Sequence, residues 1–288
     1  MTKWLVTGAA GMLGTDLCAA LDRETGAHVT AVARKALDIT DADAVADAVA
    51  GHDVVVNCAA WTNVDLAETQ ESEATGINGG GARNLAAACA GTGARLIQLS
   101  TDYVFPGDAT EPIPEDAPTA PINSYGRGKL VGEQAVTGLL PEAGYVVRTA
   151  WLYGAHGPNF VATMLRLAGE RETLDVVDDQ VGQPTSTAAL AGQLVRLGRA
   201  ALDGSAPAGI YHGTAAGQTS WHGLAAAAFE LAGLDPARVR PTSSADFVRP
   251  AKRPGYSVLA HDGWRRAGLE PMGPWREALA EAFQAGIF

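Results

Sequence analysis

The stretch KWLVTGAAGMLGTDL, residues 3–17, decides how the chain is expected to fold. An apolar, strand-like run passes through Gly8, Gly11 and Gly14 into the helical run MLGTDLCAALDRET. In a strand–turn–helix unit the first glycine permits the tight turn, the second lets a diphosphate approach, and the third lets the helix pack on the strand. The helix N-terminus then presents free N–H groups to the phosphates. The spacing therefore predicts a dinucleotide-binding unit, although the same glycines can also form a turn that binds nothing.

Strand-like and helical runs alternate from the first residue to about residue 152. The expected strands are KWLVTG, HVTAVA, DVVVNCAA, RLIQLST and GYVVRTAWLYG, and the runs between them are largely alanine-rich and helical. Near-continuous apolar strands separated by helices are typical of a parallel sheet covered on both faces. We therefore expect an α/β fold with a Rossmann-like, doubly wound parallel sheet and a smaller C-terminal α/β lobe.

The boundaries of these two parts follow from the change of pattern after residue 152. We assign residues 1–152 plus approximately 186–212 to an NADP-binding Rossmann domain. The remaining segments, approximately 153–185 plus 213–288, are assigned to a substrate-binding lobe.

Composition excludes several classes of protein. The 288 residues are 47% hydrophobic and 18% charged, as in globular proteins, and the net charge of −11 argues against binding to nucleic acid. No apolar run reaches the roughly 18–20 residues that a membrane span needs, and the N-terminus does not resemble a signal peptide. The three cysteines are widely spaced, which is typical of free thiols in a reducing compartment. We expect a cytoplasmic protein with no membrane partner and no metal site, since HExxH and CxxC pairs are absent.

One segment departs from this acidic background. Residues 235–254, DPARVRPTSSADFVRPAKRP, contain five basic and two acidic side chains. The segment is either a solvated loop or a local anion-binding site.

The second expected strand ends in AVARK, so Arg34 and Lys35 stand where an NAD-binding site usually presents an acid to the ribose. Two cations there favour the 2′-phosphate of NADPH, with NADH as the alternative, unless both side chains simply face water. Asp38 and Ile39 of LDITD are placed beside the adenine. The other residues assigned to the cofactor site are Met12, Leu13, Ala59, Ala60, Thr62, Ser100, Tyr125 and Lys129.

The motif NSYGRGK places Tyr125 and Lys129 one helical turn apart on one face. A phenol has a pKa of about 10, and a cation held beside it is expected to lower that pKa and to make it a usable general acid. The same lysine can hold the nicotinamide ribose. A hydroxyl group that orients a carbonyl is available from Ser100 or Thr101, at the carboxyl end of the strand RLIQLST, where ligands bind in open parallel sheets.

Gly126 and Gly128 interrupt this expected helix, although each glycine costs roughly 1 kcal/mol against alanine. We expect them to leave room for the nicotinamide end of the cofactor against the helix backbone.

Taken together, the motifs resemble those of the extended short-chain dehydrogenase/reductase family, over nearly the whole chain. The strings that carry the resemblance are GAAGMLG, LDITD, VVVNCAAWTNVDLAE, LSTDYVFPG, NSYGRGKLVGE, VVRTAWLYG, NFVATML, DDQVGQPTS and RPGYSVL. The resemblance implies that a reduced nicotinamide cofactor, NADPH before NADH, reduces the 4-keto group of a dTDP-4-keto-6-deoxy-L-sugar. It assigns catalysis to Thr101, Tyr125 and Lys129, with Tyr125 as the proton donor.

The resemblance also implies a set of substrate contacts. These are Thr101, Asp102, Val104, Tyr125, Trp151, Gln180, Gln183, Thr185 and Arg253. Arg253 lies in the basic segment, and a guanidinium fork suits a diphosphate. Trp151 is either a sugar contact or a core residue, and Gln180 and Gln183 either bind substrate or stabilise their loop.

Some properties stay open within this family. The keto-sugar belongs either to rhamnose biosynthesis or to an antibiotic deoxysugar pathway, and the chain is either a monomer or a homodimer. Mg²⁺ is implied by the resemblance only. One alternative function is an epimerase or dehydratase that keeps NAD tightly bound, and another is a non-catalytic NADP-binding regulatory subunit, against which the presence of Tyr125 and Lys129 argues.

Overall fold

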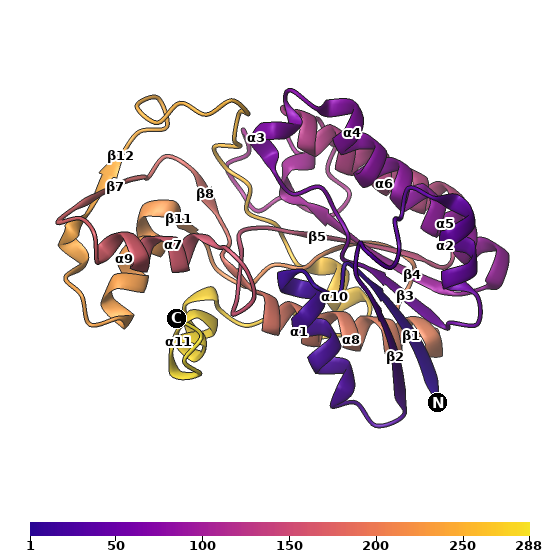
Figure 1. Cartoon of the computed structure of the whole chain (residues 1–288). Coiled ribbons are helices and arrows are strands. Elements are labelled where there is room, and N and C mark those ends of the chain that lie inside the picture. The colour runs from indigo at the N-terminus through magenta and orange to yellow at the C-terminus, as the bar shows by residue number, and fades with distance from the viewer.

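The computed structural model describes all 288 residues and places one parallel sheet of six strands at the centre of the larger lobe (Figure 1). Its strands are β1 (Thr2–Thr7), β2 (Ala27–Val32), β3 (Val54–Asn57), β4 (Arg95–Thr101), β5 (Gly144–Thr149) and β10 (Gly209–His212). They are arranged in the order β10-β5-β4-β3-β1-β2, and every neighbouring pair is parallel. All residues of β3 and β5 are buried, as their continuous apolar runs predict.

Helices cover both faces of this sheet, which confirms the predicted doubly wound fold. The covering helices are α1 (Met12–Asp22) and α8 (Thr187–Asp203) on one face, and α2 (Ala42–Val49), α5 (Ala82–Thr92) and α6 (Ser124–Leu139) on the other (Figure 1). Side chains alternate along each strand, so Trp4 and Val6 pack in the core beneath α1 and α8, whereas Leu5 packs beneath α2 and α5. The strand order reverses at β1, between β2 and β3. In open α/β sheets, such a reversal opens a crevice at the carboxyl ends of the strands, where ligands bind.

A helical segment links β3 to α5 above this crevice. It consists of α3 (Val64–Ala67), α4 (Glu71–Thr75) and a π-helical turn over Gly76–Gly81, and it packs along α6. We did not predict α3 or α4 from the sequence, because each is only one turn long. No helix of the chain is both long enough and apolar enough to span a bilayer.

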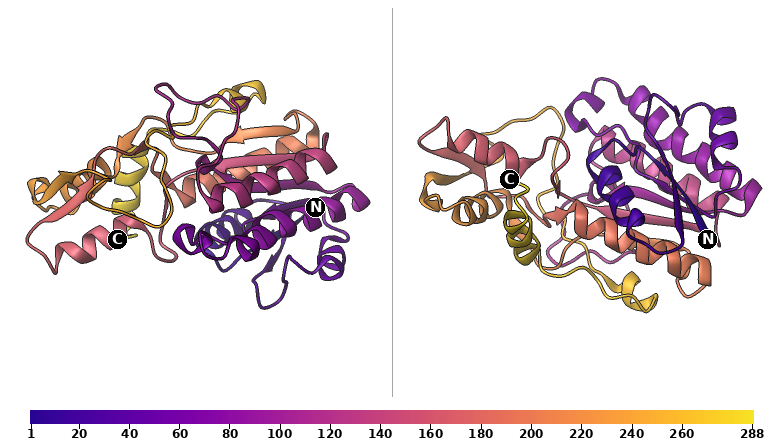
Figure 2. Two further views of the ribbon diagram at one scale, coloured as in Figure 1. Left: turned by 90° about the horizontal axis from the view of Figure 1, so that it is seen from above. Right: turned by 60° about the horizontal axis from the view of Figure 1, so that its bottom comes forward.

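The smaller lobe is built from helices and short strand pairs (Figure 2). Its helices are α7 (Phe160–Ala168), α9 (Trp221–Leu231) and α11 (Trp275–Gln284), and its strand pairs are β7 (Leu174–Val177) with β12 (Val239–Thr242), β8 (Val181–Gly182) with β11 (Thr219–Ser220), and β6 (Leu152–Tyr153) with β9 (Thr185–Ser186). One apolar cluster lies between α7, α9 and α11, and a second lies between α7, α9 and the pair β7 and β12; both are separate from the cores of the larger lobe.

One part of the C-terminal region, which we assigned to the smaller lobe, packs in a core of the larger lobe. Trp264 of α10 (Asp262–Arg266) is fully buried and, with Met272, joins the core that contains Trp4 and Tyr211. Its indole nitrogen donates a hydrogen bond to the carbonyl of His212 at 2.7 Å. The chain therefore returns to the larger lobe before it ends in α11, a crossing that the short and weakly periodic sequence around Trp264 did not indicate.

Candidate active site

The turn after β1 has the geometry expected of a phosphate-binding loop. Gly8 has a φ of +65°, and a Cβ atom there would lie 2.5 Å from the backbone nitrogen of Ala59. A Cβ at Gly14 would lie 2.3 Å from the Gly8 carbonyl oxygen, so the tight turn and the close helix packing both require glycine. Gly11 is the N-cap of α1, is exposed, and leaves the helix without a side-chain cap. The N–H groups of the first turn are therefore free to bind a diphosphate.

The surface beyond β2 retains two unpaired cations. Arg34 and Lys35 are both exposed and form no ion pair, which fits a 2′-phosphate. The Asp38 carboxylate accepts bonds from the backbone and hydroxyl groups of Thr40, and these bonds lower its pKa. The side chain of Ile39 is buried in the core beneath α2 and α5. Its place beside the adenine stays a prediction.

The other residues assigned to the cofactor lie in two places. Met12 and Leu13 begin α1, with Leu13 turned into the core. Ala59, Ala60 and Thr62 follow β3, and Thr62 is exposed.

The three predicted catalytic residues meet where β4 ends and α6 begins. The Thr101 hydroxyl donates to Asp102 Oδ1 at 2.9 Å and lies beside the phenol of Tyr125. Asn123 fixes the start of α6, because its Oδ1 atom accepts the Gly126 N–H at 2.8 Å. Tyr125 is half-buried there, and Lys129 follows one turn later as a buried residue.

The electrostatics of this site differ from the expected lowering of the Tyr125 pKa. Burial and the charge of Asp102 raise that pKa, and the Thr101 hydroxyl offsets only part of the rise. The Lys129 ammonium group donates to the Leu99 carbonyl at 2.9 Å, and the structure records no bond from it to the phenol. Burial lowers the pKa of Lys129 to about 8, against the charges of Glu133 and Cys58, which raise it. For Lys129, the removal of water therefore has a larger effect on the pKa than the nearby negative charges have.

The prediction for Gly126 and Gly128 is also wrong. A Cβ at Gly126 would lie 2.2 Å from the backbone oxygen of Tyr103, and one at Gly128 would lie 3.2 Å from the Thr75 hydroxyl. These glycines let α6 pack against the turn after β4 and against α4. The space beside them is filled by protein, so it is not available to a cofactor.

Ser100 serves a buried ion pair that the sequence did not reveal. Its hydroxyl donates to Glu133 Oε1 at 2.5 Å, and Glu133 also forms a two-pronged pair with Arg148, at 2.9 and 2.8 Å. Glu133 is 3% and Arg148 is 2% exposed. The Ser100 hydroxyl is therefore committed to this pair, which departs from its expected place against the cofactor or the carbonyl.

A second buried polar chain crosses the strand ends. The Thr7 hydroxyl donates to Asn57 at 2.6 Å, and the Asn57 amide donates to Gln98 at 2.8 Å. We did not predict this chain of bonds, although three polar residues inside apolar strand runs, Thr7, Asn57 and Gln98, indicate it.

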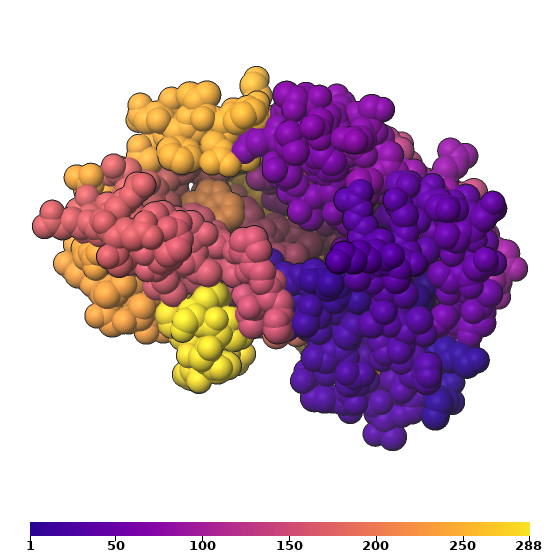
Figure 3. Space-filling view, viewed as in Figure 1, coloured from indigo at the N-terminus to yellow at the C-terminus, as the bar shows by residue number.

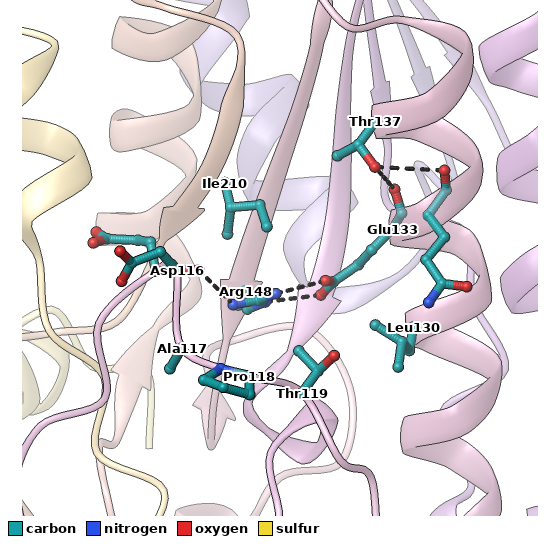
Figure 4. Close-up of a pocket in the computed structure, with 11 residues that line it drawn as sticks. Asp116, Ala117, Pro118, Thr119, Leu130, Glu133, Thr137, Arg148 and Ile210 are labelled. Carbon is teal, nitrogen blue, oxygen red and sulfur yellow. Dashed lines mark hydrogen bonds and ion pairs between the residues drawn. The ribbon is translucent and has the colours of Figure 1, made fainter.

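A cavity of about 290 Å³ lies on the other side of the buried ion pair. Figure 4 shows Arg148 at the centre of its lining, with Glu133 on one side and the segment that carries Asp116 and Pro118 on the other sides. Thr101, Tyr125 and Lys129 do not line it, so this cavity is separate from the candidate active site.

Trp151 is the one non-glycine residue with a positive φ, at 46°. Its ring stacks on Trp221, with the ring centres 3.6 Å apart and the planes 11° from parallel. The Trp221 indole nitrogen in turn donates to Gln180 at 3.2 Å. Strained backbone of this kind is concentrated at functional sites. Trp221, which was not among the predicted site residues, contacts two of the predicted substrate contacts, Trp151 and Gln180.

Three of the predicted substrate contacts are turned into the protein interior. Gln183 is 2% exposed, and its amide is bonded to the backbone of Leu259 and to the hydroxyl of Thr214. Thr185 is fully buried and donates to the Gln183 carbonyl, and Val104 is fully buried in an apolar cluster. Of the alternatives for Gln183, these bonds favour the stabilisation of its loop. Contact of the three residues with substrate stays a prediction.

Asp102 is buried next to Thr101. It is 2% exposed, and its Oδ2 atom has no hydrogen-bond partner. Burial raises the pKa of this carboxyl group to about 6, although the nearby hydroxyl groups of Ser257 and Thr101 lower it in part.

The basic segment is held by protein acceptors, so it is not a simple solvated loop. Arg249 and Arg253 both pair with Asp65, and Arg240 pairs with Asp175. Arg238 donates to three backbone carbonyls. Figure 3 shows that this segment, in orange, borders a hollow between the two lobes.

Acidic residues do not gather into a metal-binding group. The structure contains no cluster of three or more His, Cys, Asp or Glu side chains that could hold an ion. Asp178 and Asp179 face different partners, because Asp178 pairs with Ser220 and Asp179 accepts bonds from Ser243 and Ser244.

Comparison with known proteins gives one consistent result. The family model described as the RmlD substrate binding domain matches residues 2–287. A dTDP-4-dehydrorhamnose reductase of Streptomyces griseus is 59% identical over 98% of this chain and 93% of the relative. A dTDP-4-keto-6-deoxy-D-glucose reductase of Streptomyces niveus is 53% identical over 98% of this chain and 96% of its own length. The crystal structure of a Bacillus anthracis dTDP-4-dehydrorhamnose reductase in complex with NADP superimposes with a TM-score of 0.92, at 39% identity, over 99% of this chain and 100% of that one.

Proposed function

Because this chain belongs to the family of the RmlD substrate binding domain, we propose that it reduces the 4-keto group of a dTDP-4-keto-6-deoxy-L-sugar with NADPH. The chain is an NAD(P)H-dependent oxidoreductase, as its reductase relatives are. The observation that supports the proposal is that Thr101, Tyr125 and Lys129 lie where β4 ends and α6 begins, at the same carboxyl edge of the sheet as the uncapped N-terminus of α1. The high identity with the Streptomyces griseus enzyme makes dTDP-4-dehydrorhamnose the first substrate to test.

The chain's own residues fit the proposed cofactor at three points. The free N–H groups after Gly11 suit the diphosphate, and Arg34 and Lys35 suit the 2′-phosphate. Lys129, buried with a single carbonyl partner, can turn toward the nicotinamide ribose. NADPH, when bound, supplies the hydride that reduces the carbonyl carbon.

Tyr125 supplies the proton that the carbonyl oxygen needs. Its raised pKa keeps the phenol protonated at neutral pH, as a proton donor must be. The Lys129 cation then stabilises the phenolate that remains. The Thr101 hydroxyl, at the end of β4, orients the carbonyl oxygen once its O–H turns from Asp102 to the substrate. In this proposal Trp151, which packs against an apolar cluster of the smaller lobe, supports the sugar from that side.

Two alternatives have less support. An epimerase or dehydratase needs further acid/base residues, and Asp102, the one acid next to Thr101, is buried and bonded to that hydroxyl. A non-catalytic NADP-binding subunit does not need Tyr125 and Lys129 to converge. The Streptomyces niveus relative is the reason to include a D-configured keto-sugar among the substrates tested.

The test follows NADPH oxidation and the product NMR spectrum with a dTDP-4-keto-6-deoxy-L-sugar made in place. Wild-type protein should oxidise one NADPH for each sugar reduced at C4. Tyr125→Phe should lower kcat by about 10²–10⁴ while NADPH still binds. The matched control is Tyr153→Phe, which removes a buried hydroxyl that has no partner and should leave kcat unchanged. Protein that binds NADPH but reduces none of the dTDP-keto-sugars would refute the proposal.

A further inference from the structure

Asp65 connects the two lobes through a segment that we call the strap, residues 249–257. Asp65 lies in α3, shortly after the loop expected beside the cofactor. It accepts bonds from Arg249 Nη2 at 2.7 Å, from Arg253 Nη1 at 2.5 Å and from the Ala251 N–H at 3.2 Å. In Figure 1 the orange segment that leads into the strap approaches α3. One carboxylate of the larger lobe therefore gathers three donors from the strap.

The strap also touches the residues around the catalytic centre. The Asn123 amide, from the N-cap of α6, donates to the Lys252 carbonyl at 2.9 Å. The Arg253 side chain lies beside the Tyr103 hydroxyl, and the Tyr103 ring is edge-on to Tyr125 with ring centres 6.0 Å apart. These contacts place the Arg253 guanidinium at the catalytic end of the hollow between the lobes.

The Arg253 guanidinium is held at one nitrogen and retains donors at the others. Its Nη1 atom donates to Asp65 and to the Ala251 carbonyl, and neither Nε nor Nη2 pairs with a carboxylate. The Arg253 side chain is 16% exposed. Two arginines against one aspartate also leave a local charge of +1, so the group can still attract an anion. A guanidinium fixed in this way has little conformational freedom left to lose when it binds a phosphate.

We propose that Asp65 is a positioning residue that holds Arg253 so that its free edge binds the diphosphate of the sugar nucleotide. The proposal rests on the proposed function, which supplies a dTDP-linked ligand. Asp65 itself does not touch the ligand. It acts by fixing the guanidinium in a geometry that suits two parallel bonds to phosphate oxygens.

The test measures dTDP and NADPH binding by calorimetry for wild type and Asp65→Asn. Without the Asp65 charge, Arg253 is held less firmly and its charge-assisted bonds to the dTDP phosphates weaken. Asp65→Asn should therefore lower dTDP affinity about tenfold to a hundredfold. NADPH affinity should not change. KM for the keto-sugar should rise more than kcat falls, and Asp65→Glu should recover part of the loss. The matched control is Asp175→Asn, which breaks the exposed pair with Arg240 and should bind dTDP as wild type does.

A second variant makes the argument specific to Arg253. In an Arg253→Gln background, adding Asp65→Asn should cause no further loss of dTDP affinity, because the group that it positions is gone. The inference is overturned if Asp65→Asn binds dTDP as well as or better than wild type, if NADPH affinity falls equally, or if the two substitutions act independently. Failure of wild-type protein to bind dTDP, while it still binds NADPH, would instead overturn the proposed function.

Discussion

The buried pair of Glu133 and Arg148 offers a prediction whose size can be worked out from the structure. Glu133→Gln keeps the side-chain volume and removes the negative charge. Arg148, 2% exposed, would then be a buried cation without a counter-charge. Breaking a buried pair in this way costs about 3–5 kcal/mol of unfolding free energy, out of a total of about 5–15 kcal/mol for a typical domain.

The matched comparison is Glu71→Gln. Glu71 pairs with Arg127 at 2.7 Å, a similar distance, but both side chains are 45% exposed. Exposed pairs contribute about 0–1 kcal/mol, so this variant should remain close to wild type. Urea unfolding of both variants at pH 7 gives the two free energies. Equal costs for Glu133→Gln and Glu71→Gln would refute the reasoning from burial.

Glu133→Gln should also change how kcat/KM depends on pH. The Glu133 charge raises the pKa of Lys129, which burial brings to about 8. Without that charge the pKa of Lys129 falls further, so the ammonium form is lost at a lower pH. The alkaline decline of kcat/KM should therefore begin at lower pH in Glu133→Gln than in wild type. If the single variant does not refold, Glu133→Leu with Arg148→Met should refold, because an apolar pair leaves no buried charge unpaired.

Single contacts elsewhere predict three further outcomes. Wild-type kcat/KM should decline with an apparent pKa of about 8 as Lys129 loses its proton, and a profile without an alkaline decline would contradict a role for that cation. Arg34→Asp should lower the NADPH to NADH preference by about tenfold or more, since an acid repels the 2′-phosphate and suits the ribose hydroxyl; an unchanged ratio would place the phosphate elsewhere. Gly126→Ala should cost about 1–3 kcal/mol in urea unfolding, because its Cβ would meet the Tyr103 backbone oxygen, whereas Gly138→Ala in the same helix meets nothing and should stabilise by up to about 1 kcal/mol.

The sequence by itself determined the parts of this protein that depend on local patterns. The continuous apolar strand runs predicted a sheet covered on both faces, and Trp4 and Leu5 lie in the two cores on opposite faces of that sheet. The glycine spacing predicted the turn at Gly8, and the four-residue spacing predicted that Tyr125 and Lys129 share a helix face. Each of these follows from backbone geometry within a few residues, so it survives in any tertiary context.

The tertiary structure decided what surrounds those groups. Whether the pKa of Tyr125 rises or falls depends on the water that other segments exclude and on Asp102, not on the spacing to Lys129 alone. The atom that leaves no room for a side chain at Gly126 is a backbone oxygen from a different loop. Asp65 and Arg253 form an ion pair although they are far apart in the sequence. Desolvation and long-range pairing are set by which distant segments come together, and local sequence patterns carry no information on that choice.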